Sequence, residues 1–188
     1  GSLRRILGTR AVGHTGTLDP LASGLMVCLV NEGTKLSQYI LEGDKGYRVT
    51  LQFGFETDTL DVTGSVLKKQ EYQISREQVL RVALALQGEF SFEVPIYSAI
   101  KVQGQKLYEY ARNNEEVKIP LKLMKFWDVK MLEFTGSSAS FDICCSKGSY
   151  IRTWVQQLGR GLGCGATMSD LRRTWSAPYF GEAGMTLD

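Results

Sequence analysis

Apolar and polar residues alternate along several stretches of the chain, and this alternation predicts β-strands. The clearest stretch is 45–54, where Tyr47, Val49, Leu51 and Phe53 share one face and Arg48 lies on the other. Apolar runs and turn residues predict further extended segments at 25–30, 65–67, 88–95, 96–102, 117–134 with a break near Pro120, 138–146 and 166–176. The turn at 135–137 joins two of them as a hairpin.

Apolar residues spaced three to four apart predict helices between these strands. Ser75 and Gln78 form a capping box at the start of one helix, which Gly88 ends. The other predicted helices cover 34–41, 106–112 and 150–162. We therefore expect an α+β fold, with a mostly antiparallel central sheet and flanking helices, as a single domain over 1–188.

A glycine-rich loop at 13–24 precedes the apolar run 25–30, which we expect to be a buried strand. Asp19 lies in the middle of this loop, five residues after His14, the single histidine of the chain. A charged side chain in a rigid loop beside a strand is a common position for a catalytic group. An Asx turn that only caps the bend uses the same residues, and spacing alone leaves both readings open.

Composition narrows the class of protein. The chain has 188 residues, of which 43% are hydrophobic, and no apolar run approaches the length of a membrane span, so a cytoplasmic protein is expected. The net charge is only +2, but residues 1–18 carry three arginines and no acid, and residues 101–130 carry seven bases against four acids. These local excesses fit either a phosphate-binding surface or an ordinary solvated face.

The residues that could bind a metal have no recognisable spacing. The four cysteines contain no CxxC pair, so we expect neither a metal nor a disulfide. The acidic loop at 56–64, with Asp58 and Asp61, is a weak candidate for binding a cation, because it lacks the glycine and terminal glutamate of a calcium loop.

Three polar groups next to turns could take part in chemistry: Asp19, Tyr47 and Arg152. A buried carboxylate needs a partner to stay ionised, and the planar fork of arginine suits it best, so Asp19 and Arg152 are a predicted pair. Asp19 could then act as a nucleophile or stabilise positive charge on a sugar. A glycosidase would need a second carboxylate, and none has a comparable setting.

Five segments together resemble the TruB-type tRNA pseudouridine synthases, in order and over nearly the whole chain. They are GHTGTLDPLASG at 13–24, KGYRV at 45–49, VPIYSAIK at 94–101, LYEYAR at 107–112 and CSKGSYIRT at 145–153. Ile100 replaces a leucine that is common in the family, a volume-conserving change. The family's first strand with its Lys-Pro-x-Gly motif and its C-terminal PUA domain have no counterpart, so weaker RNA binding is expected.

The resemblance implies a role for each site residue. Asp19 would attack the sugar or assist cleavage of the glycosidic bond, Tyr47 would pack on the flipped uracil and move the proton from its C5, and Arg152 would pair with Asp19. His14 would fill the space that the flipped base leaves in its stack. Three further residues would contact the substrate: Tyr150 and Leu171 line the pocket, and Lys147 either touches phosphate or merely flanks a turn.

The implied activity is isomerisation of uridine to pseudouridine in the TΨC loop of tRNA, at uridine-55, without metal or organic cofactor. The TΨC stem-loop would be the partner, with no obligatory protein partner and no membrane, and the chain would be a monomer. The 88–135 region would include an RNA-contacting insertion. Two other functions remain open: an RNA-binding or tRNA-folding module, and a guide-RNA-dependent relative. The insertion at 97–112 is more similar to that of the stand-alone type than to that of the guide-RNA-dependent type.

Overall fold

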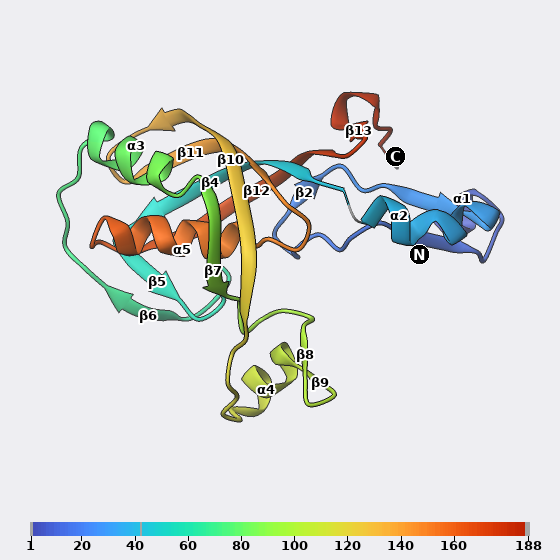
Figure 1. The fold of residues 1–188 in the computed structure, drawn as a ribbon, viewed down its shortest axis with the longest axis horizontal. Coiled ribbons are helices and arrows are strands. Elements are labelled where there is room, and N and C mark those ends of the chain that lie inside the picture. The colour runs from blue at the N-terminus through green and yellow to red at the C-terminus, as the bar shows by residue number, and fades with distance from the viewer. Residues whose placement is uncertain (1, 42, 187–188) are drawn as a thin grey trace.

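A seven-stranded sheet forms the centre of the computed structural model, which describes residues 2–41 and 43–186 (Figure 1). Its strand order is β13–β12–β4–β11–β10–β7, with β2 added beside β12. The strands are β2 (Ser23–Gly24), β4 (Lys45–Phe53), β7 (Gly88–Glu93), β10 (Leu121–Phe134), β11 (Ser138–Cys145), β12 (Ala166–Ser176) and β13 (Tyr179–Phe180). Within this sheet β2 and β12 run parallel and the other pairs antiparallel, so the predicted α+β fold with a mostly antiparallel sheet is confirmed.

Two helices, α3 (Arg76–Ala85) and α5 (Ile151–Gly161), pack on one face of this sheet. Strict alternation in β11 buries its apolar residues toward these helices, and the Phe141 ring meets Trp154 of α5 edge to face, with centroids 5.3 Å apart. The capping box of Ser75 and Gln78 is present as predicted. The opposite face of the sheet is polar and carries the ion pair of Arg48 with Asp142.

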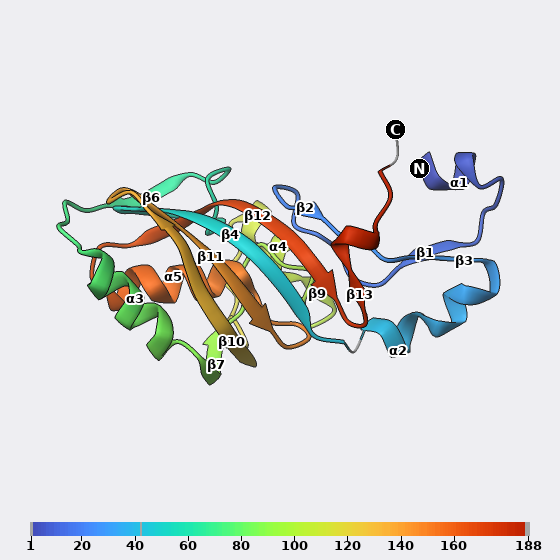
Figure 2. The same ribbon diagram turned by 90° about the horizontal axis from the view of Figure 1, so that it is seen from above.

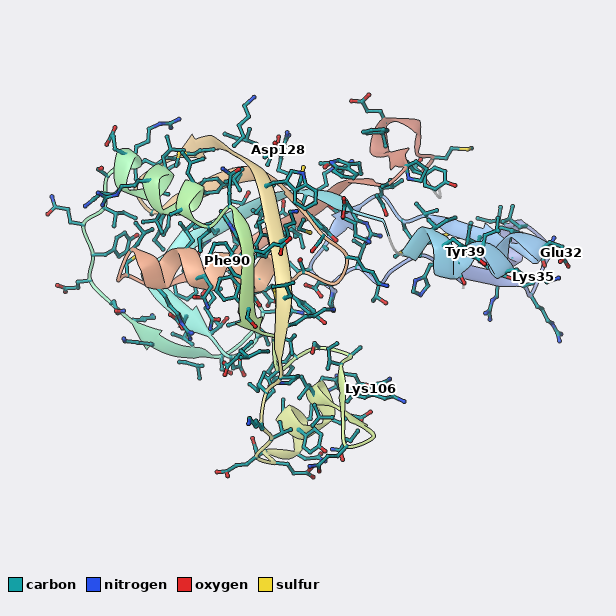
Figure 3. All side chains as sticks on the ribbon, in the orientation of Figure 1. Glu32, Lys35, Tyr39, Phe90, Lys106 and Asp128 are labelled. Atoms are coloured by element: carbon teal, nitrogen blue, oxygen red, sulfur yellow. The ribbon has the colours of Figure 1, made fainter. Side chains whose placement is uncertain are left out.

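The N-terminal segments form an arm that extends away from the sheet (Figures 1 and 2). Its elements are α1 (Ser2–Ile6), β1 (Val12–His14), β3 (Cys28–Val30), the 3₁₀ helix η1 (Asn31–Leu36) and α2 (Ser37–Leu41). Tyr39 lies on this arm near Glu32 and Lys35, which form an ion pair with each other (Figure 3). Tyr39 is 70% exposed, so the arm offers no core of its own at this point.

A small lobe follows β7 and precedes β10 in the chain, and it projects beyond the ends of these strands that lie farther from α3 (Figure 1). It consists of β8 (Lys101–Val102), β9 (Gln105–Lys106) and α4 (Leu107–Asn113), with Lys106 at its surface (Figure 3). A separate hairpin of β5 (Phe55–Thr57) and β6 (Val66–Lys69) follows β4, and η2 (Gly181–Ala183) ends the described elements. The lobe falls within the region 88–135 that was expected to hold an insertion.

Two predicted strands differ from the structure. The strand expected at 96–102 is wrong except for Lys101 and Val102, because the carbonyl oxygens of Ser98 and Ile100 accept from the first residues of α4 rather than from a neighbouring strand. The buried strand expected at 25–30 is present only as β3, and its residues are half-buried. β3 pairs with β1 in a two-stranded ribbon that has no third strand among the described residues, so its faces stay partly open.

Candidate active site

The loop that carries Asp19 is docked on the central sheet by its own end. Ala22 donates its backbone N–H to the Asp19 carbonyl at 2.8 Å, which makes a tight turn around Pro20. The loop then enters β2, where Gly24 is the parallel partner of Arg173 in β12. Gly24 has φ +96°, and a Cβ there would lie 2.3 Å from the Arg173 carbonyl oxygen, so only glycine permits this approach.

Arg152 and Asp19 form a two-pronged ion pair. The Nε atom of Arg152 donates to Asp19 Oδ2 at 2.8 Å, and Nη2 donates to Oδ1 at 3.0 Å. The arginine side chain is 5% exposed and that of the aspartate 29%. A buried guanidinium therefore holds the carboxylate from behind, while one side of the carboxylate is open to a ligand.

Two further donors of Arg152 bind backbone carbonyl groups. Nη1 donates to Thr59 at 3.0 Å, and Nη2 donates to Tyr97 at 3.1 Å. Arginine at the start of α5 thus joins the Asp19 loop to the segment after β5 and the segment after β7. Four of its five N–H groups are thus engaged, so the guanidinium cannot turn away without losing several bonds at once.

The acids of the 56–64 loop hold the loop together. Asp61 is 6% exposed, and its Oδ1 accepts from the Thr59 hydroxyl and from both the backbone N–H and the hydroxyl of Thr63. Asp58 accepts from the backbone of Ser65. These bonds fix the Thr59 carbonyl that Arg152 uses. Within the described parts of the chain, no group of three or more His, Cys, Asp or Glu residues could hold a metal ion.

Tyr47 lies on the helix-facing side of β4, with Ile143 of β11 and Arg173 of β12 as its cross-strand partners. Burial raises the pKa of its phenol from 10.0 to about 12, and the charge of Asp19 acts in the same direction. The positive charge of Arg173 and a hydrogen bond from it oppose this rise. The phenol of Tyr47 is therefore within electrostatic reach of the Asp19 carboxylate and protonated at neutral pH.

Two more of the predicted residues adjoin this group. Tyr150 is the N-cap of α5, two residues before Arg152, and burial raises the pKa of its phenol. Leu171 is 4% exposed in β12, where its cross-strand partner is Val49 of β4. Tyr150 is half-buried and packs against the hydrophobic core to which Leu171 belongs.

His14 and Lys147 lie at exposed positions outside this cluster. His14 ends β1, paired through its backbone with Cys28. Lys147 occupies the turn that Ser149 closes by donating its N–H to the Ser146 carbonyl at 3.1 Å. Its charge lowers the pKa of the buried Lys45 further, although burial of Lys45 is the larger cause.

Sequence reasoning missed Arg173 as a member of the site. This arginine is 1% exposed in β12 and donates to the Leu25 carbonyl at 2.7 Å. A signal was present, since Leu171 and Arg173 are two apart in a strand and share one face. A charged residue on the face that carries the core is therefore readable from the alternation alone.

Two properties of the whole chain bear on the classes of function. Its four cysteines are free thiols. The helices in the described ranges 2–41 and 43–186 are all too short or too polar to span a bilayer.

Comparisons with known proteins agree on one family. A model of the N-terminal domain of the TruB family of pseudouridylate synthases matches residues 4–151, and a model of the C-terminal domain of tRNA pseudouridylate synthase B matches 152–188. The second segment supplies β12, which pairs with β4 from the first. Both matched segments therefore contribute strands to one sheet.

Relatives and solved structures extend this match. The chain is 67% identical to tRNA pseudouridine synthase B of Bdellovibrio bacteriovorus over 99% of its own length and 61% of that protein, and 44% identical to the Bordetella avium protein of that name over 98% and 77%. The chain thus spans about three fifths of the Bdellovibrio protein. The Cbf5-Nop10-Gar1 complex contains a chain with TM-score 0.73 and 26% identity, covering 95% of this chain and 44% of that one. On these grounds, the chain belongs to the TruB family of pseudouridylate synthases.

Proposed function

We propose that the chain isomerises uridine to pseudouridine in the TΨC loop of tRNA, at uridine-55. The observation that carries this proposal is the partly open Asp19 carboxylate, held by buried Arg152 within electrostatic reach of the Tyr47 phenol. The names of the close relatives support tRNA as the substrate class. The pair fits a reaction at a sugar carbon beside an aromatic base.

In this reaction Asp19 attacks C1′ or stabilises its positive charge while the bond from C1′ to N1 breaks. The freed uracil turns, C1′ bonds to C5, the hydrogen on C5 leaves as a proton, and N1 takes up a proton. Atoms and electrons balance within the nucleotide, so the chemistry needs neither a redox cofactor nor a co-substrate. Arg152 holds the Asp19 carboxylate in one orientation throughout, through its two hydrogen bonds.

Tyr47 gives the flipped uracil a flat surface and a route for the C5 proton. Because its pKa of about 12 keeps the phenol protonated at neutral pH, it would act as a relay: its oxygen accepts the C5 proton while its own proton passes through solvent to N1. Arg173 eases this relay, since its positive charge favours the phenolate. Tyr150 and Leu171 would complete the apolar walls around the base.

Base flipping requires that something fill the gap in the RNA stack. His14 is exposed at the end of β1, five residues before Asp19, which suits a side chain that enters RNA as the base leaves. Lys147 would contact a phosphate beside the site, and the lobe of β8, β9 and α4 would contact the stem. A cytoplasmic monomer that acts without a protein partner fits this role best.

Mapping of pseudouridine in tRNA transcript tests the proposal directly. The chain should modify one uridine of the TΨC loop, and Asp19→Asn should lose at least about a thousandfold in rate while tRNA affinity stays within about threefold. Asp142→Asn is the matched control, since that carboxylate also binds an arginine with two bonds but on the opposite face of the sheet. Full activity of the Asp19→Asn protein would exclude the proposal.

A guide-RNA-dependent relative is the second candidate, favoured by the structural likeness to the Cbf5 chain of a protein complex. Activity on bare tRNA without added proteins or guide RNA would exclude it. An RNA-folding module is the third candidate. It would be favoured if cells with the Asp19→Asn protein keep normal function and lose it when Lys122 and Lys125 are neutralised.

A further inference from the structure

Arg173 binds both ends of the segment that carries Asp19. Its Nε donates to the Leu25 carbonyl at 2.7 Å, and its Nη2 approaches the Gly16 carbonyl at 3.4 Å. These acceptors lie three residues before and six residues after Asp19 in the chain. One guanidinium therefore holds the two ends of the loop together, and Asp19 lies between the two contacts.

The backbone of Arg173 holds the same loop. Its carbonyl accepts from the Leu25 N–H at 2.9 Å, and Gly24 is its parallel neighbour in β2. The loop end is thus bound to β12 through both the main chain and the side chain of one residue. Because the Arg173 side chain is 1% exposed, water cannot replace its bonds to the two carbonyl groups.

Arg173 also touches the other reactive group. Tyr47 of β4 is its direct cross-strand partner. The guanidinium makes a hydrogen bond to the Tyr47 phenol and places a positive charge beside it. Only the fork of arginine offers enough donors in fixed directions for the loop and the phenol together. A lysine would supply one charge but would have to choose among these acceptors.

We propose that Arg173 is a positioning residue that sets the distance between the Asp19 carboxylate and the Tyr47 phenol. This inference rests on the proposed function, in which both groups act on one nucleotide, the first at C1′ and the second at C5. An error of about 1 Å in such a pair can slow a reaction about a hundredfold. Binding of the RNA as a whole depends on other contacts and is unaffected.

The test compares Arg173→Lys with Arg172→Lys, its neighbour on the opposite, exposed side of β12. The single-turnover rate at saturating tRNA transcript and the Kd for tRNA are measured for each protein. Hydrogen exchange of the amides at 15–25 is measured beside that of α3. We expect Arg173→Lys to lower the rate at least about thirtyfold with Kd within threefold, and to speed exchange in the loop but not in α3.

Gly24→Ala is a second variant that leaves the Arg173 side chain in place but pushes the loop off β12, and the same loss of rate without loss of affinity is expected. An Arg173→Lys rate within threefold of the parent, an equal loss of affinity, or unchanged loop exchange would overturn the inference. Failure of the unaltered chain to make pseudouridine would instead reject the proposed function. The exchange measurement would then still decide whether Arg173 holds the loop.

Discussion

Arg152 and Asp19 are joined by two hydrogen bonds although 133 positions separate them in the chain. The arginine comes from the first turn of α5 and the aspartate from a loop docked on β12. The pair can form only when α5 packs on the sheet and the loop end pairs with β12. The pair is therefore assembled by the tertiary fold, and it joins parts of the fold that lie far apart in the sequence.

Arg152→Met should destabilise the chain by about 3 kcal/mol, because it leaves a carboxylate and two carbonyl groups without their buried partner. Arg48→Met removes the same kind of two-pronged pair with Asp142, but there the arginine side chain is 53% exposed. We expect that change to cost less than about 1 kcal/mol. Urea unfolding of the two variants measures the difference, and equal losses would show that burial is not what makes the Arg152 pair important.

Tyr47 should make the chain less stable in alkali. Its pKa is 10.0 in an unfolded chain and about 12 in the fold, so the folded state keeps the proton that the unfolded state loses. Stability is complete below pH 10 and falls as the pH rises to 12, by roughly 2–3 kcal/mol from this group.

Tyr47→Phe removes this part of the loss, so its unfolding free energy should change less between pH 9 and 11.5 than that of the parent. Cys145 also lowers the stability in this pH range, since burial raises its pKa from 9.0 to about 12. Both proteins contain Cys145, so its contribution cancels when the curve of Tyr47→Phe is subtracted from that of the parent. Tyr39→Phe, at a phenol that is 70% exposed, is the control. Parallel curves for Tyr47→Phe and the parent would contradict the assigned pKa.

Gly46 lies against the indole of Trp175, and a Cβ there would come 1.9 Å from its Nε1 atom. Gly46→Ala should therefore displace Trp175 and cost about 1–3 kcal/mol in urea unfolding. Gly33→Ala is the matched control, because a Cβ at Gly33 meets nothing within 4 Å. Unfolding of Gly46→Ala at the same or a higher urea concentration than the parent would contradict the prediction.

Local patterns carried much of the fold. The alternation at 45–54 predicted β4 because one face of that strand is buried along its length and the other is polar. The capping box at Ser75 predicted where α3 begins. The Asp19–Arg152 pair followed from electrostatics, since an enclosed carboxylate needs a planar cation. Its presence confirms that contact, while the catalytic roles of both residues stay predictions.

Other features depend on contacts that no local pattern records. The segment 96–100 is apolar enough for a strand, yet its carbonyl groups serve α4 and Arg152 instead. The loop end at 25–27 is held by Arg173, which comes from nearly 150 residues further along the chain. The conformation at such positions is set by residues far away in the chain. The local sequence pattern therefore indicates which residues are involved but does not predict how they are arranged.

The lobe of β8, β9 and α4 should contribute charge to tRNA binding. Lys101 begins the lobe and Lys118 lies five residues after α4, and both are exposed. Each contact with a phosphate releases counterions, so Lys101→Gln with Lys118→Gln should make log Kd depend less steeply on log salt, by about 1.5. Lys68→Gln with Lys69→Gln, on exposed β6, lowers the net charge equally, from +2 to 0. The Kd for tRNA is measured at salt concentrations from roughly 50 to 300 mM, over which screening changes strongly. Comparing the slopes of the two double variants separates a local contact from a general charge effect. Equal changes of slope in both double variants would mean that the lobe does not touch RNA.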